Sequence, residues 1–222
     1  MKIKMYTGLL GLALIGWMQA ATAAETIQLF DGKSFEGWDY FLVEEGVKLE
    51  DVWAVNDGII VCKGEPFGYL YTQQAFKNYK LVVEWRWAPG KKPSNSGVLL
   101  RIAGDHRFLP RCAEAQLQFG SAGDIWAFEG MKVTGHPART RDVKGHELLG
   151  DFVGVGKIQN NEKDPGEWNR YEITFDQDVL ALVVNGVQVN VASGLDNVAG
   201  AIGLQSEGGE IHFRKVELTP LD

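Results

Sequence analysis

Apolar and polar residues alternate along most of the chain after residue 24, in short runs that turn residues interrupt. An alternation with a period of two is typical of β-strands, because successive side chains point to opposite faces. The runs expected to form strands are Ile27–Phe30, Trp53–Val55, Ile59–Cys62, Tyr69–Thr72, Leu81–Trp87, Val98–Ile102, Ala113–Phe119, Ile125–Phe128, Tyr171–Phe175, Val179–Val184, Val187–Ala192, Ala201–Gln205 and Ile211–Leu218. The pattern predicts an all-β fold: a jelly-roll sandwich of two antiparallel sheets.

Turn residues support this interpretation. Asn56-Asp57-Gly58 and Asn185-Gly186 each separate two expected strands and are typical of tight hairpins. The nearest approach to a helical pattern is weak and covers Phe41–Lys48. The segment from Glu129 to Glu167 has no clear period, so we expect either a loop that covers a binding cleft or a solvated excursion with short extra strands.

The first 24 residues are typical of a secretory signal peptide. Lys2 and Lys4 precede an apolar run from Leu9 to Met18, and small residues follow up to Ala24. A transmembrane anchor is the alternative, but the apolar run is shorter than the roughly 20 residues that span a bilayer. We therefore expect a periplasmic or secreted protein whose residues 25–222 form a single jelly-roll domain.

The charge of the chain bears on its partners. The chain has 22 basic and 29 acidic residues and a net charge of −7. Removal of the expected signal peptide, which contains Lys2 and Lys4, makes the net charge more negative by two. Nucleic acids and anionic lipid surfaces attract basic proteins, so neither partner is expected, and no membrane insertion is expected. A neutral or weakly charged carbohydrate fits better, and the oligomeric state stays open.

The only two cysteines are Cys62 and Cys112. Export to an oxidising compartment would allow a disulfide between them. The alternative is that both are buried thiols that pack as small apolar residues. The sequence leaves these two interpretations open.

Several expected strands carry acids, amides or arginine on the face opposite their apolar side chains. If the apolar faces form the core, the polar faces of adjacent strands form one shared surface. The residues assigned to that surface are Glu84, Arg86, Arg101, Glu114, Gln116, Gln118, Gln205 and Glu207. Such a surface is either an ordinary solvated sheet face or a binding site for a polar ligand.

Aromatic residues near these polar positions favour the second interpretation. A sugar offers both apolar C–H faces and hydroxyl groups, so a sugar site needs aromatic rings beside acids and amides. The aromatic residues in question are Trp38, Trp53, Tyr69, Tyr71 and Trp126. Each of them could instead belong to the core, because aromatic side chains bury large areas.

The chain resembles the 3-keto-disaccharide hydrolase domain family, formerly a domain of unknown function, which has a concanavalin-like jelly-roll fold. The residues that carry the resemblance are Leu29–Lys33 with Gly37-Trp38, Trp53–Gly58, Gly68–Thr72, Glu84–Arg86, Asn95–Val98 with Arg101, Ala113–Gln116, Gly166–Asn169, Asn185-Gly186, Gly203–Gly208 and Ile211–Arg214. Each motif is weak by itself, but their order covers nearly all of residues 25–222. The chain departs from the family pattern after Gln116 and between Gly130 and Asp151.

The resemblance implies that the chain cleaves glycosides whose glucose unit carries a ketone at carbon 3. The ketone acidifies the proton on carbon 2, so a base can remove that proton, the glycosidic oxygen leaves, and water then adds. The resemblance and the shared surface imply Glu114 and Glu207 as base and acid, in either order, with Arg101 near the enolate oxygen. The residues expected to bind the substrate are Gln116, Gln205, Asn95, Trp126 and, more weakly, Glu84 and His212.

Two other functions and a metal requirement are alternatives. A lectin-like module that binds carbohydrate without catalysis is the main alternative. A retaining glycosidase of the laminarinase type needs paired carboxylates, usually as Glu-x-Asp-x-Glu, and Glu114 is the only acid in its run. No cofactor is expected. The histidines have no common ligand spacing, although a divalent ion held by His and carboxylate side chains that the fold brings together could polarise the ketone.

Overall fold

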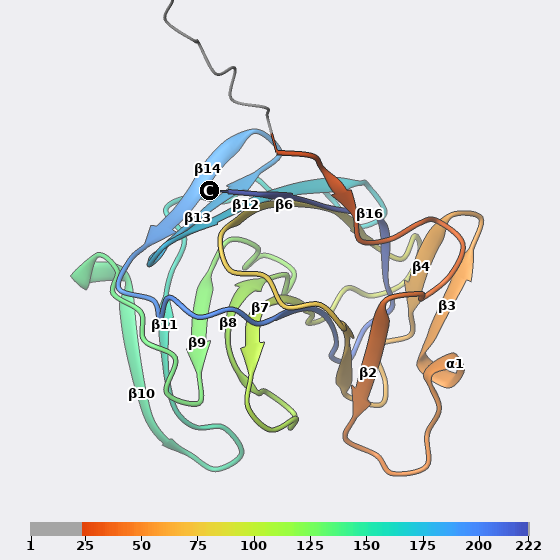
Figure 1. The fold of residues 1–222 in the computed structure, drawn as a ribbon, viewed down its shortest axis with the longest axis horizontal. Coiled ribbons are helices and arrows are strands. Elements are labelled where there is room, and N and C mark those ends of the chain that lie inside the picture. Colours follow the sequence, from red (N-terminus) through yellow and green to blue (C-terminus); the bar gives the residue numbers. More distant parts are fainter. Residues whose placement is uncertain (1–23, 222) are drawn as a thin grey trace, which may run out of the picture.

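The computed structural model describes residues 24–221, which form two antiparallel sheets of eight strands each (Figure 1). Sheet A contains, in order, β14 (Val187–Ala192), β13 (Val179–Val184), β12 (Asn169–Asp176), β6 (Tyr79–Trp87), β16 (Ile211–Pro220), β4 (Ile59–Cys62) and β3 (Trp53–Asn56), and β1 (Ile27–Gln28) pairs with β16. Sheet B contains, in order, β10 (Thr140–His146), β11 (Gly150–Val155), β9 (Ile125–Phe128), β8 (Arg111–Gln116), β7 (Gly97–Ala103), β15 (Ala201–Ser206), β5 (Gly68–Thr72) and β2 (Trp38–Leu42). The predicted jelly-roll sandwich is confirmed.

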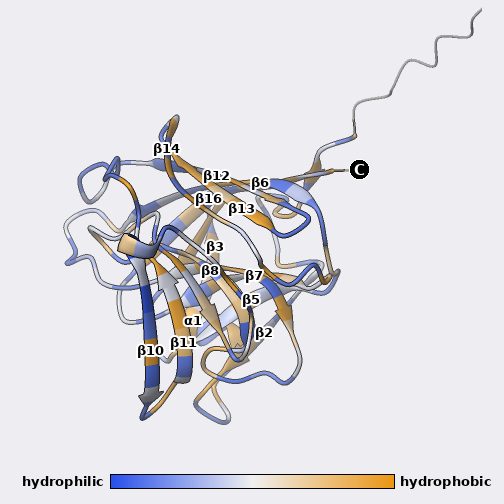
Figure 2. Ribbon diagram, turned by 90° about the vertical axis from the view of Figure 1, so that its left-hand side faces the viewer, coloured by the Kyte–Doolittle hydropathy of each residue, from blue (hydrophilic) through white to orange (hydrophobic). Residues whose placement is uncertain are grey.

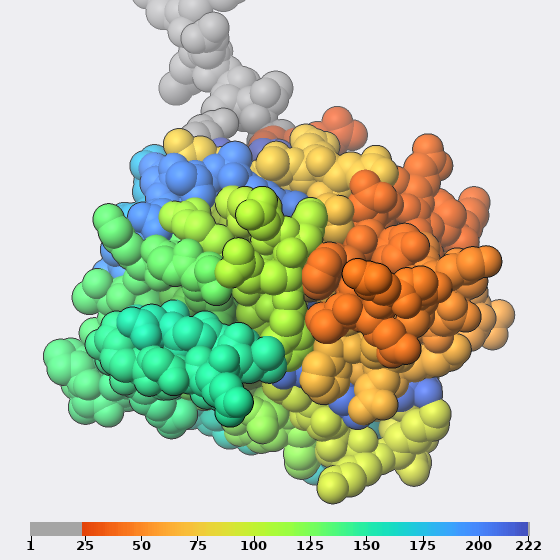
Figure 3. Space-filling model, turned by 90° about the horizontal axis from the view of Figure 1, so that it is seen from below, coloured from red at the N-terminus to blue at the C-terminus, as the bar shows by residue number. Residues whose placement is uncertain are grey.

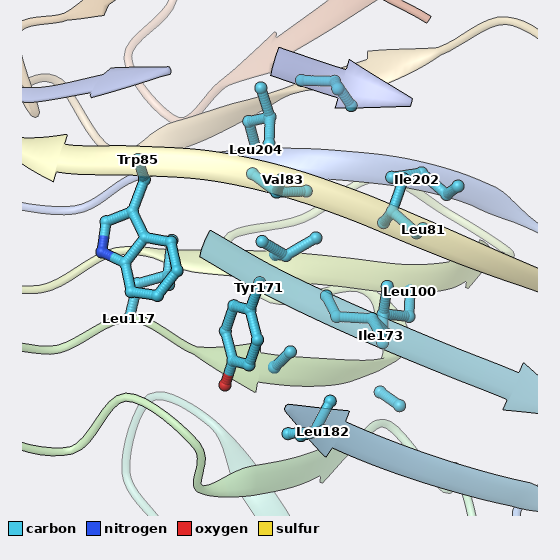
Figure 4. Close-up of a cluster of buried hydrophobic side chains, with 14 of the residues drawn as sticks. Leu81, Val83, Trp85, Leu100, Leu117, Tyr171, Ile173, Leu182, Ile202 and Leu204 are labelled. Carbon is cyan, nitrogen blue, oxygen red and sulfur yellow. The ribbon is translucent and has the colours of Figure 1, made fainter. Parts of the chain in front are cut away.

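The core lies between the two sheets. The alternation within each strand directs one set of apolar side chains inward, and Figure 4 shows Trp85 from β6, Tyr171 and Ile173 from β12 and Leu100 from β7 in this layer. All four are fully buried, and the rings of Trp85 and Tyr171 lie 5.1 Å apart between centroids. Each such side chain contributes about 1.5–3 kcal/mol by leaving water.

Sheet B is also partly apolar on its outer face, away from sheet A. A second cluster there contains Tyr69, Leu99, Ile102, Leu109, Cys112 and Phe128. Its cover comes from the loop between β7 and β8, which supplies Leu109, and from β11, which supplies Phe152. Figure 3 shows this side of the molecule, with the teal β10–β11 segment and the orange β2 segment on opposite sides. The outer face of sheet B is therefore a walled surface and not a plain solvated one.

The long segment from Glu129 to Glu167 supplies one of these walls. It contains the short 3₁₀ helix η1 (Pro137–Arg139) and the hairpin of β10 and β11, which extends sheet B beyond β9. Figure 2 shows β10 as the most hydrophilic strand, in keeping with its position at the sheet edge. The segment therefore contains the short extra strands of one interpretation. It also borders the outer face of sheet B, as the other interpretation expected.

The weak helical pattern at Phe41–Lys48 does not correspond to a helix in the structure. Phe41 belongs to β2, and the single α-helix in the described range is α1 (Leu49–Val52). The register of β2 explains the difference, because Phe41 pairs with Tyr69 of β5 and completes a strand ladder that no local pattern announces. No helix among residues 24–221 is long and apolar enough to cross a membrane.

Two further expectations concern single segments. The predicted signal peptide lies outside the described residues, apart from Ala24. Cys62 and Cys112 are both free, fully buried thiols. Cys62 lies in the core between the sheets, whereas Cys112 lies in the outer cluster of sheet B, so both pack as apolar side chains.

We expect Ile173→Ala to lower the free energy of unfolding by about 2–5 kcal/mol, because it leaves a cavity in the layer between the sheets. Urea denaturation would measure the loss. The matched control is Val191→Ala on edge strand β14, where the side chain is 38% exposed and the expected change is within about 0.5 kcal/mol. Equal losses in both variants would contradict the placement of Ile173.

Candidate functional site

Two glutamates face a cavity of about 130 Å³ on the outer face of sheet B. The residues that line it are Asn95, Leu109, Glu114, Gln116, Trp126, Phe128, Leu149, Phe152 and Glu207. A larger hollow of about 440 Å³ lies at Glu44 and residues 65–67, but its lining residues do not include a buried acid. The smaller cavity is the better candidate because it combines carboxyl groups, amides and aromatic rings.

Strand β8 places Glu114 in this cavity by simple alternation. Ala113 and Ala115 point into the core between the sheets, so Glu114 and Gln116 point to the outer face. The neighbouring strand β7 leaves room for the acid at Gly97. A Cβ atom at that position would lie only 2.1 Å from Oε1 of Glu114, so a side chain there would displace the carboxyl group.

Glu114 is a buried acid with an unsatisfied oxygen. It is 2% exposed, and its Oε1 atom has no hydrogen-bond partner among residues 24–221. Burial is the main cause that raises the pKa of Glu114 well above its usual value, and the nearby carboxylates of Glu207 and Asp124 raise it further. The protonated form is favoured, and a protonated carboxyl group can donate a hydrogen bond or a proton.

Glu207 is the second acid and has a different environment. It follows β15 directly, and a backbone bridge pairs it with Asn95. Burial is the largest effect and raises the pKa of Glu207 to about 7, while hydrogen bonding by the side chains of Asn95 and Gln205 acts in the opposite direction. A carboxyl group with this pKa is ionised in part at neutral pH and can accept a proton.

Three amides, those of Asn95, Gln116 and Gln205, surround the two acids. Gln116 is nearly buried, and its Oε1 atom accepts hydrogen bonds from the backbone N–H groups of Leu117 and Gln118, at 2.9 and 2.8 Å. This arrangement leaves the amide nitrogen of Gln116 as a donor for a ligand. Gln205 is fully buried, and its amide forms no well-aligned hydrogen bond within the described chain. Buried polar groups of this kind cost stability unless a ligand or water satisfies them.

Aromatic rings form the wall opposite the amides. Trp126 and Phe128 come from β9, and Phe152 comes from β11. The ring of Phe152 lies 5.6 Å from that of Trp126 and 5.4 Å from that of Phe128, between centroids. Gly154 of β11 gives Trp126 its space, because a Cβ atom there would lie 2.3 Å from the indole ring.

The structure does not bring Arg101 to this cavity, and its predicted position is wrong. Arg101 has a φ of 54°, and the pairing of β7 with both neighbouring strands is irregular around it. These features form a β-bulge, which reverses the alternation of side chains along the strand. Its guanidinium group donates to the backbone oxygens of Lys77 and Asp196 at 2.7–3.0 Å and lies 3.4 Å from the ring centroid of Phe175. Arg101 therefore ties loops together beside the core.

Glu84 and His212 also lie away from the cavity, because β6 and β16 belong to sheet A and not to sheet B. The carboxylate of Glu84 accepts hydrogen bonds from Arg170 and Arg214. His212 contacts Glu210 at 3.0 Å and accepts a hydrogen bond from Arg86 at 3.3 Å. The single shared surface predicted from the sequence is thus divided between two sheets.

The remaining expectations have mixed outcomes. Asn95, Gln116, Trp126 and both glutamates line the cavity as predicted, and Gln205 lies next to Glu207, whereas Gln118 is exposed beyond the end of β8. Across residues 24–221, no group of three or more His, Cys, Asp or Glu side chains is arranged to hold a metal ion.

Sequence reasoning missed several residues of the outer face. Leu109, Leu149 and Phe152 line the cavity. Leu109 and Leu149 lie in loops, and Phe152 lies in β11, within the segment whose sequence has no clear period. The hydroxyl group of Tyr69 lies 2.8 Å from Nδ1 of His106, a contact that joins β5 to the loop after β7. No sequence signal connects these two residues, because 36 others separate them.

Comparisons with solved structures agree with the observed fold. The fold is that of the concanavalin-like jelly rolls, a class found among carbohydrate-active proteins. A Parabacteroides distasonis protein, solved as a candidate glycosyl hydrolase, superposes with a TM-score of 0.63 at 20% identity, covering 89% of this chain and 94% of that one. The carbohydrate-binding module CBM66 from Bacillus subtilis superposes with a TM-score of 0.58 at 11% identity, covering 82% and 94%.

The sequence comparisons are more specific. Residues 25–219 match the family described as 3-keto-alpha-glucoside-1,2-lyase-like domain, and the chain belongs to this family. A curated relative, the 3-keto-disaccharide hydrolase of Bacteroides thetaiotaomicron, is 23% identical over 237 aligned residues, which cover 88% of this chain and 78% of the relative. The resemblance noted from the sequence motifs is confirmed.

We expect Arg101→Lys to lower the free energy of unfolding by about 2–4 kcal/mol, because lysine cannot replace the forked hydrogen bonds or the stacking on Phe175. Urea denaturation would measure the loss, and Arg141→Lys on the exposed edge strand β10 is the control. The pKa of Glu207, followed by NMR, should stay the same. A shifted Glu207 titration with unchanged stability would contradict this structural role.

Glu207 should make stability depend on pH. In the folded protein the pKa of Glu207 is about 7, above the ordinary value of 4.5, so the folded form holds a proton at pH values at which the unfolded chain has released it. Binding of this proton stabilises the fold, and that stabilisation is lost as the pH rises through 7. Glu207→Gln should reduce the fall in unfolding free energy between pH 4.5 and pH 8 by about 2–3 kcal/mol. Urea denaturation at both pH values tests this, with Glu147→Gln at an exposed position as the control. An unchanged fall would contradict the raised pKa.

Proposed function

We propose that the chain cleaves 3-keto-glycosides by elimination at the keto-sugar, followed by addition of water. The observation that carries the proposal is the pair of glutamates with unequal environments, since burial favours the protonated form of Glu114 and holds the pKa of Glu207 at about 7. Two carboxyl groups with separated pKa values can serve as acid and base in one reaction. Family membership and the curated relative support the same substrate class.

The elimination step assigns one role to each acid. The carboxylate of Glu207 removes the proton from carbon 2, and the electron pair moves to the ketone oxygen as an enolate. The enolate then collapses, the bond from carbon 1 to the glycosidic oxygen breaks, and Glu114 gives its proton to the departing oxygen. The product is an unsaturated ketone with a double bond between carbons 1 and 2. Each proton transfer of this kind contributes roughly 10²–10⁴ to the rate.

Water addition reverses the proton movements. Glu114, now ionised, accepts a proton from water as the oxygen attacks carbon 1. Glu207 returns its proton to carbon 2, which restores the keto-sugar and both acids. The cycle needs no external oxidant or reductant, and we propose that it uses no organic cofactor.

The developing enolate needs hydrogen-bond donors, and amides take the place first assigned to Arg101. The amide nitrogen of Gln116 is available, because the oxygen of the same amide is already bound by backbone N–H groups. The amide of Gln205 is buried beside Glu207, where it can turn toward either the carboxyl group or the enolate oxygen. Donors fixed in advance stabilise a developing oxyanion more than mobile water does. Trp126 and Phe152 would stack on the sugar ring.

A carbohydrate-binding module without catalysis is the second candidate. It is favoured by the superposition on CBM66, a protein whose name describes binding alone. The two candidates differ in whether the bound sugar is cleaved. For either function, the signal-like start of the chain supports a protein that works in the periplasm or outside the cell.

We expect the purified protein to release glucose or its 3-keto form from 3-keto-trehalose, and not from unoxidised trehalose. Glu207→Gln and Glu114→Gln should each lower kcat/KM at least about tenfold, because each removes one proton transfer. The control is Glu84→Gln on sheet A. Its kcat/KM, calculated per amount of folded protein, should stay within about twofold of that of the unmodified protein. Sugar binding without turnover of any keto-glycoside would favour the binding module.

A further inference from the structure

Asp124 is a third buried acid beside the two glutamates, and the proposed reaction does not use it. The register of β8 and β9 pairs Glu114 with Trp126, and the backbone N–H of Gln116 donates to the backbone oxygen of Asp124 at 3.0 Å. Asp124 therefore stands opposite Gln116, two residues before Trp126. Ile125 points into the core between the sheets, so the alternation turns Asp124 and Trp126 to the outer face, where Glu114 lies.

The carboxylate of Asp124 is buried without a counter-ion. The residue is 8% exposed, and its Oδ1 atom accepts a hydrogen bond from the backbone N–H of Lys157 at 2.8 Å. No side chain within residues 24–221 forms a salt bridge with it. The ammonium group of Lys157 donates to the backbone oxygen of Gly120 and to Oδ1 of Asn160. Buried charges are ordinarily paired, so an unpaired one at this position calls for a functional explanation.

The position of Asp124 allows a strong electrostatic effect on Glu114. Residues that stand diagonally on one face of neighbouring antiparallel strands lie about 7 Å apart. Two negative charges at that separation repel each other, and shelter from water strengthens the repulsion. Glu207 repels a charge on Glu114 in the same way. Protonation of Glu114 relieves both repulsions at once.

The other groups that face Glu114 carry no charge at neutral pH. Strand β7 presents a glycine, and the walls from the β7–β8 loop and from β11 present apolar side chains. Cys112 on β8 and Tyr171 from sheet A are fully buried, and burial raises the pKa of each well above its usual value. Asp124 and Glu207 are therefore the charges that decide the protonation of Glu114.

We propose that Asp124 is a positioning residue that holds Glu114 in its proton-donating form. The inference rests on the proposed function, in which Glu114 gives its proton to the departing oxygen. Asp124 precedes β9, next to the strand of Glu114, whereas Glu207 follows β15, on the far side of β7. The third carboxylate therefore acts on one glutamate of the pair and widens the difference between their protonation states.

The test removes the charge of Asp124 and keeps its hydrogen bond. Asp124→Asn retains an oxygen that can accept from the backbone N–H of Lys157. The carboxyl carbon of Glu114, assigned by the loss of its signal in Glu114→Gln, would be followed by NMR in ¹³C-glutamate-labelled protein without substrate. Its titration midpoint should fall by about one pH unit, whereas that of Glu207 should stay at about 7. An unchanged Glu114 midpoint would overturn the inference.

A control and a second variant complete this measurement. Asp178→Asn is the matched control, because Asp178 also accepts a backbone N–H, that of Gly194 at 3.0 Å, but lies between β12 and β13 of sheet A. It should leave the Glu114 midpoint unchanged. If Asp124→Asn does not fold, Lys157→Gln decides, since it removes a cation that acts on Asp124 and should raise the Glu114 midpoint. A midpoint that stays or falls in Lys157→Gln would count against the inference.

Kinetics separate this inference from the proposed reaction. In Asp124→Asn, the alkaline limb of kcat/KM for 3-keto-trehalose should move about one pH unit lower, because Glu114 loses its proton earlier, and the acidic limb should stay at about pH 7. A lower Glu114 midpoint supports the inference even if no keto-glycoside is cleaved, in which case only the proposed reaction fails. A lower alkaline limb with an unchanged Glu114 midpoint would overturn the inference and leave the reaction intact.

Discussion

The burial of the Glu114 carboxyl group is the constraint on which the rest of the site depends. Strand β8 turns this side chain toward the outer face of sheet B, and Gly97 on the neighbouring strand leaves the space that the carboxyl group occupies. Leu109 and Phe152 line the cavity beside it, and burial of the carboxyl group disfavours the charged form and raises the pKa of Glu114. Burial also raises the pKa of Glu207, and the two acids differ because Glu207 is less deeply buried.

Sheet B can hold such a site because both of its faces are sheltered. One face packs on sheet A, and the other is walled by the β7–β8 loop and by the hairpin of β10 and β11. An antiparallel sheet usually leaves its second face to water, where carboxyl groups keep ordinary pKa values. The additional walls convert a solvated face into a surface with apolar, amide and acidic parts, which suits a ligand with both C–H and hydroxyl groups.

Strand positions were predictable because the alternation of apolar residues is local information. The hairpin turns at Asn56–Gly58 and Asn185-Gly186 were predictable for the same reason. It was not predictable which side chains share a face, because a single bulge or a change of sheet alters the direction in which a side chain points. Arg101 lies on a bulge that reverses its direction, and Glu84 is on a strand of the other sheet, so two apparent neighbours of Glu114 lie elsewhere.

The sequence by itself determined the all-β class, most strand boundaries, the family, and the pairing of Glu114 and Glu207 as candidate acids. Each of these depends on short-range patterns or on motifs whose order survives in the chain. Only the tertiary structure decided which polar residues meet, since contacts such as Tyr69 with His106 or Trp126 with Phe152 join distant segments. Those contacts follow from the order of the strands in each sheet and from the packing of the loops. Both depend on the stability of the whole sandwich, which no short stretch of sequence contains.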